Sequence, residues 1–136
     1  MRSNMETIIP KLLVAEDDFE NQRLLQMFLK RKFEVHVCDS AESFYKKMSE
    51  HKFDIFLMDI ALRGNKDGLQ LTKELRLMNE YANAPIICIS AHVFPKDRAN
   101  AYEAGVDEFL ARPVFNQDLL ESLIRIYKEK TGIDLT

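Results

Sequence analysis

The chain has 136 residues, 46% of them apolar, and its 22 acidic and 19 basic side chains leave a formal net charge of −3. This length and composition are typical of one globular domain with a single core. The weakly acidic balance argues against direct nucleic-acid binding, and no apolar run approaches the roughly 18 residues of a membrane span.

Short apolar runs alternate five times with amphipathic segments of helical length, which predicts a βα repeat. The predicted strands, in chain order, are 11–16, 33–38, 53–59, 85–90 and 107–112. The first helix is expected to share one apolar face among Leu24, Leu25, Phe28 and Leu29, and the last helix among Leu120, Leu123, Ile124 and Tyr127. His36 and His51 are expected to be exposed.

Polar residues and turn formers between these segments mark the expected helix ends. Asp17 or Asp18 can cap the first helix, and Asp39 with Glu42 can form a capping box for the second. For the later helices, Asp67 is expected to cap the third, Pro95 to lie in the first turn of the fourth, and Asn116 and Gly132 to flank the fifth.

The first, third and fourth strands are apolar on both faces, as interior parallel strands are, whereas the second alternates and therefore reads as an edge strand. Right-handed crossovers then predict a doubly wound α/β domain with a five-stranded parallel sheet in the order 2-1-3-4-5 and helices on both faces. We expect this domain to span residues 11–131, after an N-terminal extension (1–10) and before a short tail (132–136).

Polar side chains follow four of the predicted strands. Glu16, Asp17 and Asp18 follow the first strand, and the third, fourth and fifth strands end at Asp59, Ser90 and Arg112. Ligands in such folds bind at the carboxyl ends of the strands, where these side chains would meet.

Several carboxylates at one rim repel each other, which raises their pKa values or requires a cation. Oxygen ligands at an open rim suit Mg²⁺, and a carboxylate nucleophile, a hydroxyl and a fixed cation beside it describe phosphoryl transfer. Each residue taken singly also fits a helix cap, a loop residue or a solvated side chain. Their convergence on one rim is what favours the functional interpretation.

At these residues the chain resembles the receiver domains of two-component response regulators, which have a flavodoxin-like fold. The resemblance rests on four segments: LLVAEDDFENQRLL, FDIFLMDIAL, ICISAH and AGVDEFLARPV. It covers about residues 11–130. In detail, the residues of these segments are most similar to receivers in or beside hybrid histidine kinases, which implies a phosphorelay.

The resemblance implies a role for each rim residue. Asp59 would be the phosphoacceptor, and Mg²⁺ would be bound by Asp17, Asp59 and the backbone carbonyl of Ala61, with Glu16 acting through water. Ser90 and Arg112 would contact the phosphoryl group. Ser90 and Phe109 would switch the surface made by the fourth helix, fifth strand and fifth helix.

The last motif departs from the family at Arg112, where receivers nearly always have lysine. This departure keeps open a second reading, a pseudo-receiver that binds partners without switching by phosphorylation. A flavin-binding domain is disfavoured because Glu16, Asp17 and Asp18 would repel its phosphate. A hydrolase with an aspartyl-phosphate intermediate is disfavoured because EDDFE lacks a DxD nucleophile motif.

The leading interpretation is therefore a stand-alone receiver that is no enzyme beyond its own phosphorylation and dephosphorylation. Its expected partners are a histidine kinase or histidine phosphotransfer domain, a downstream effector protein and a second copy of the chain, with no direct nucleic-acid or membrane contact. Cys38 and Cys88 match no metal-ligand spacing and read as buried free thiols, which suggests the cytoplasm.

Overall fold

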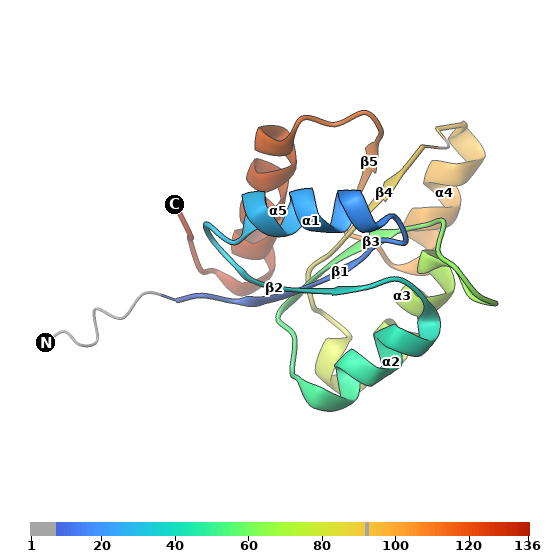
Figure 1. Cartoon of the computed structure of the whole chain (residues 1–136), viewed down its shortest axis with the longest axis horizontal. Coiled ribbons are helices and arrows are strands. Elements are labelled where there is room, and N and C mark those ends of the chain that lie inside the picture. The colour runs from blue at the N-terminus through green and yellow to red at the C-terminus, as the bar shows by residue number, and fades with distance from the viewer. Residues whose placement is uncertain (1–7, 92) are drawn as a thin grey trace, which may run out of the picture.

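A computed structural model describes residues 8–91 and 93–136 and confirms the predicted α/β architecture. Five parallel strands form one sheet in the order β2-β1-β3-β4-β5. Helices α1 and α5 cover one face of the sheet, and α2, α3 and α4 cover the other (Figure 1). The carboxyl ends of all five strands therefore meet at one edge, between the two helical layers.

The strands coincide with the predicted apolar runs to within two residues. They are β1 (Lys11–Ala15), β2 (Glu34–Cys38), β3 (Ile55–Asp59), β4 (Ile86–Ser90) and β5 (Glu108–Ala111). Every residue of β3 and β4 is buried, whereas β2 is buried only at its last residue. The apolar and alternating patterns thus predicted the interior and edge positions correctly.

The helices are α1 (Phe19–Leu29), α2 (Ala41–Glu50), α3 (Gly68–Leu77), α4 (Pro95–Ala104) and α5 (Asn116–Thr131), with a 3₁₀ helix η2 (Asn79–Tyr81) after α3. Asp18 caps α1, and Asp67 caps α3 by accepting a hydrogen bond from the Gln70 N–H. Pro95 begins α4, and Gly132 follows α5 with a φ of 80°. These four helix ends agree with the sequence-based expectations.

Two expected caps are wrong. The helix α2 begins one residue later than expected, because Ser40 and Ser43 form the capping box and the Asp39 carboxylate instead accepts a hydrogen bond from the Ser43 hydroxyl (2.9 Å). At α5 the capping position is Phe115, and Asn116 is the first residue of the helix. At α2 the expected cap and the true cap, Asp39 and Ser40, are adjacent residues of similar capping ability, so the sequence hardly separates them. At α5 the capping position lacks a side-chain hydrogen bond, so the preference for Asn at a cap misplaced the helix start by one residue.

The core consists of two apolar layers, one on each face of the sheet. Phe44, Phe56 and Leu71 anchor the layer under α2 and α3, and Leu12, Leu29 and Leu123 anchor the layer under α1 and α5. The expected apolar face of α5 is confirmed, but Leu24 on α1 is 57% exposed. Within the described segments, none of the helices is both long enough and apolar enough to cross a bilayer.

The edge strand β2 directs alternate side chains to the two layers. Val35 and Val37 face the layer under α1, whereas Cys38 packs in the layer under α2. His36 shares the α2 side with Cys38, because residues two apart lie on one face of a strand. Neither His36 nor His51 is fully exposed as expected: both are half-buried, and their rings lie 4.3 Å apart between centroids.

Candidate functional site

Four of the five strands place a chemically active side chain at the same edge of the sheet. Glu16 and Asp17 follow β1, and Asp59 and Ser90 are the last residues of β3 and β4. Arg112 follows β5, and its backbone N–H donates to the Ser90 carbonyl (2.8 Å), which holds the two chain segments together. The structure thus brings the predicted rim residues into one place.

Three carboxylates form the centre of this site. One oxygen from each of Glu16, Asp17 and Asp59 lies within 4.8 Å of the other two. Glu16 and Asp59 are buried, at 2% and 4% exposed, and Asp17 is half-buried. Asp18 takes no part in this cluster, because its carboxylate caps α1 by accepting from the Asn21 N–H.

Arg112 reaches into the cluster and bridges two of its acids. Its Nη1 donates to Asp59 Oδ2 (2.8 Å) and its Nη2 donates to Glu16 Oε1 (2.5 Å). Despite its bulk, the guanidinium thus reaches both Asp59 and Glu16. Three carboxylates facing this one guanidinium leave two negative charges uncompensated, which equals the charge of one divalent cation.

The electrostatic environment of Asp59 reflects its burial. Burial raises the pKa of Asp59 to about 6, and the neighbouring Glu16 charge acts in the same direction. The Arg112 guanidinium and the backbone N–H of Ala61, which donates to Asp59 Oδ1 (2.9 Å), oppose this increase. Both oxygens of the carboxylate are thus held in defined directions.

The two residues expected to switch lie on neighbouring strands. Ser90 is 2% exposed at the end of β4, and Phe109 is 4% exposed within β5, in the core layer beneath α4. The Phe109 ring lies under the Arg98 guanidinium, 5.4 Å from its carbon, so it points inward in this structure.

Two further residues shape the site without having been recognised in the sequence. The Gln22 side chain donates to the Glu16 carbonyl (2.6 Å) and holds the end of β1 in place. Gly68, the first residue of α3, packs against the Asp59 carbonyl so closely that a Cβ there would lie 2.2 Å from the oxygen. The only local signal was that Gly68 follows the capping Asp67, where many residues would be accepted.

Comparison with known proteins places this arrangement in a family. Residues 12–124 match the response regulator receiver domain. The chain belongs to this family. A receiver domain is a signalling module of two-component systems, and the five-stranded sheet with its acidic rim agrees with that identity.

Individual relatives support the same assignment. The transcriptional regulatory protein SrrA of Staphylococcus aureus is 30% identical over 104 residues, which cover 76% of this chain and 42% of SrrA. A putative response regulator from Chloroflexus aurantiacus superposes with a TM-score of 0.81 at 26% identity, over 88% of this chain and 98% of that one. A CheY-like receiver domain protein from Methanospirillum hungatei superposes with a TM-score of 0.83 at 21% identity, over 92% and 98% of the two chains.

The receiver thus spans less than half the length of SrrA. The stand-alone arrangement expected from the sequence stays a prediction.

Proposed function

We propose that this receiver accepts a phosphoryl group on Asp59 in a Mg²⁺-dependent reaction, as part of a two-component phosphorelay. The observation that carries the proposal is the cluster of Glu16, Asp17 and Asp59, whose oxygens lie within 4.8 Å of one another beside Arg112. Placing two further acids beside a buried acid destabilises the fold through charge repulsion and desolvation. A structural role therefore does not explain the cluster.

The donor set of the cluster fits Mg²⁺. All three side chains offer carboxylate oxygens, which are the ligands of hard divalent cations, and the half-buried Asp17 leaves the rim open to water. Asp17 and Asp59 would hold the ion directly, together with the Ala61 carbonyl, and Glu16 would act through water. Bound there, Mg²⁺ would neutralise the charge of the phosphoryl oxygens.

The protein's own groups would orient the reaction. The Asp59 carboxylate attacks phosphorus, forms an acyl phosphate, and displaces the neutral donor group, such as the imidazole of a phosphohistidine. The Ala61 N–H and Arg112 fix the direction of the attacking carboxylate, and Ser90 and Arg112 would contact the transferred phosphoryl oxygens.

The signal would leave through the surface formed by α4, β5 and α5. Movement of Ser90 toward a phosphorylated Asp59 would open space beside it, and Phe109 would repack there. A histidine kinase or histidine phosphotransfer domain would supply the phosphoryl group, and an effector would bind the altered surface. The two free, buried cysteines support the expectation of a reducing, cytoplasmic setting.

One observation favours the pseudo-receiver as a second candidate. Arg112 already pairs with Glu16 and Asp59 through one hydrogen bond each, so it compensates part of the acidic charge without a metal ion. If these ion pairs persist, phosphorylation would have to displace the guanidinium from Asp59, and the domain could act by binding partners alone.

Phosphorylation of the purified chain tests the proposal. We expect incubation with a small phosphodonor and Mg²⁺ to add one phosphoryl group by intact-mass measurement, and chelation of Mg²⁺ to prevent it. Asp59→Asn should remove the label, whereas Asp54→Asn, at an exposed acid before β3, should retain it. Labelling that survives in Asp59→Asn would show that the acceptor is another residue, and an unlabelled wild type would favour the pseudo-receiver.

A further inference from the structure

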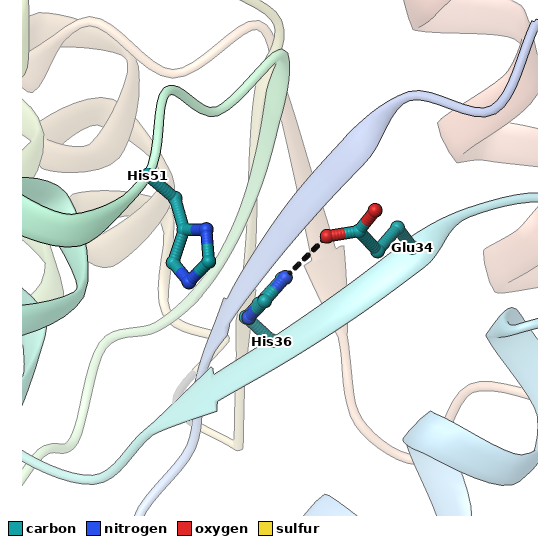
Figure 2. Close-up of side chains that lie close together, drawn as sticks. All are labelled: Glu34, His36 and His51. Carbon is teal, nitrogen blue, oxygen red and sulfur yellow. Dashed lines mark hydrogen bonds and ion pairs between the residues drawn. The ribbon is translucent and has the colours of Figure 1, made fainter.

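A second group of potential metal ligands lies on the edge strand β2, among residues that the phosphoryl-acceptor site does not use. Glu34 and His36 stand two residues apart on β2, and His51 follows the last residue of α2. The side chains of all three lie close together beside the strand (Figure 2). One ligand atom from each lies within 4.8 Å of the other two.

We propose that Glu34, His36 and His51 bind a divalent transition-metal ion of the Zn²⁺ type. Two imidazoles and one carboxylate are a ligand set typical of zinc and its neighbours, and they leave a position for water or a further ligand. This proposal does not depend on phosphorylation of Asp59.

The distances are those of a site that needs only small side-chain movements. His36 Nε2 and Glu34 Oε2 lie 2.7 Å apart, joined by a hydrogen bond. Metal–ligand bonds of about 2.0–2.1 Å in a tetrahedron require ligand atoms about 3.3 Å apart. Replacing the shared proton by a metal ion would therefore separate this pair slightly, while the other pairs, at most 4.8 Å apart, would close by at most about 1.5 Å.

The rings are positioned by an apolar support. Phe53, which is 4% exposed, contacts both imidazoles, with centroid distances of 5.5 Å to His36 and 5.8 Å to His51. This packing reduces the rotamer freedom that ligand binding would otherwise remove. The Glu34 side chain is 49% exposed, so it can rotate to complete the coordination.

The ring positions and the nearby charges bear on cation binding. The centroids of the two imidazole rings lie 4.3 Å apart, close enough for both rings to share one metal ion. The Glu34 carboxylate supplies negative charge, and the Lys11 ammonium, 3.9 Å from it, partly opposes this effect.

The position of the cluster separates it from the acidic rim. Glu34 begins β2 and His51 precedes β3, whereas Glu16, Asp17 and Asp59 stand at the carboxyl ends of their strands. The ligand chemistry differs as well, since imidazole nitrogens select transition metals and carboxylates at an open rim suit Mg²⁺. A bound ion would tie the edge strand to the segment between α2 and β3.

Calorimetric titration of the full chain with Zn²⁺, in buffer containing millimolar Mg²⁺ to occupy the rim, tests the proposal. We expect one Zn²⁺ per chain, and we expect His36→Gln and His51→Gln each to weaken binding at least about tenfold. Glu34→Gln should weaken it less, because the more exposed carboxylate is the more easily replaced by water. Binding that is equally tight in His36→Gln and in the wild type would overturn the proposal.

Matched variants separate this site from others. Glu42→Gln removes an exposed glutamate of α2, His92→Gln removes the third histidine of the chain, and Asp17→Asn impairs the rim. All three should bind Zn²⁺ within about twofold of the wild type if the ligands are those proposed. A loss in Asp17→Asn alone would assign the Zn²⁺ to the rim and contradict the proposal.

Amide NMR of the unmodified chain with Ni²⁺ gives a readout that does not depend on how well the variants fold. Paramagnetic broadening should be centred on Glu34, His36 and His51. Broadening centred on Asp17 and Asp59 instead, or no localised broadening, would exclude the proposed site.

Discussion

Arg112 donates one hydrogen bond to each of two acids rather than two hydrogen bonds to one acid. A fork that donated both hydrogen bonds to Asp59 would hold that carboxylate more firmly, but here one bond goes to Asp59 and the other to Glu16. Both carboxylate oxygens of Glu16 therefore accept hydrogen bonds, one from Arg112 and the other from the Asp18 N–H (3.0 Å). Asp17, half-buried and outside these contacts, is the acid best placed to bind a cation directly.

This division of roles predicts an order of effects on Mg²⁺ affinity. Asp17→Asn should weaken Mg²⁺ binding more than Glu16→Gln, because in the proposed site Asp17 would be a direct ligand and Glu16 would act through water. Calorimetry or intrinsic tyrosine fluorescence measures both affinities, with Asp18→Asn as the control outside the cluster. Equal and negligible losses in the two test variants would favour the pseudo-receiver.

Asp59 and α3 are linked by a loop that returns onto the end of its own strand. The Gly68 N–H donates to the Ile60 carbonyl (2.9 Å), and the missing side chain of Gly68 lets α3 begin directly against the Asp59 backbone. The position of Asp59 is therefore determined partly by the first turn of α3, which begins nine residues further along the chain.

Gly68→Ala should destabilise the domain, although glycine-to-alanine changes in helices usually stabilise. A Cβ 2.2 Å from the Asp59 carbonyl oxygen requires the backbone to shift, at a cost of about 1–3 kcal/mol in the free energy of unfolding. Urea denaturation measures this cost, and the rate of phosphorylation by a small phosphodonor should fall with it.

Gly64→Ala is the matched control in the same loop. Nothing lies within 4 Å of a Cβ at Gly64, but its φ of 94° makes alanine cost about 1 kcal/mol in backbone strain. Its phosphorylation rate should stay near that of the wild type. A similar rate in both variants would mean that contact with Gly68 does not position Asp59.

At the scale of the whole molecule, one apolar layer contains both thiols. Cys38 and Cys88 pack on the same face of the sheet, at 3% and 0% exposed. Burial raises the pKa of each thiol from its ordinary 9.0 to about 12. The neutral thiol is therefore the form that the folded state favours.

Both thiols should resist modification at pH 8 in the folded protein and react after unfolding in urea. The raised pKa of the thiols also makes the free energy of unfolding depend on pH. The thiols of the unfolded chain lose their protons from about pH 9, while those of the folded chain keep theirs up to about pH 12. Stability should accordingly fall as pH rises through this window. In Cys38→Ala the decline should be shallower, and an unchanged slope would show that Cys38 is not responsible.

A second prediction for the whole molecule concerns the proposed switch. Binding of beryllofluoride, a phosphoryl analogue, should shift the amide NMR signals of α4, β5 and α5 if Phe109 repacks on phosphorylation. We expect smaller shifts in the wild type than in Arg112→Lys, because lysine has a single ammonium and cannot bridge Asp59 and Glu16 as the fork does. Analogue binding without any shift in the wild type, together with shifts in Arg112→Lys, would show that the arginine uncouples the switch.

Much of this molecule could be predicted from local patterns. The spacing of apolar residues predicted the five strands and the five α-helices. The alternation of apolar and polar residues in β2 predicted its place at the edge of the sheet. Parallel connectivity then predicted that Glu16, Asp17, Asp59, Ser90 and Arg112 lie at one rim. In a parallel sheet, the crossover helices return the chain so that all strands point the same way, and their carboxyl ends share one edge.

Only the tertiary structure decided which side chains contact each other. The sequence does not show that Arg112 bridges Glu16 and Asp59, that Gly68 packs against the Asp59 carbonyl, or that His36 and His51 lie side by side. Periodicity describes the face on which a residue lies, within one element. Contacts between elements depend on how helices and strands pack in three dimensions, and residues far apart in the chain carry no local signal of that packing.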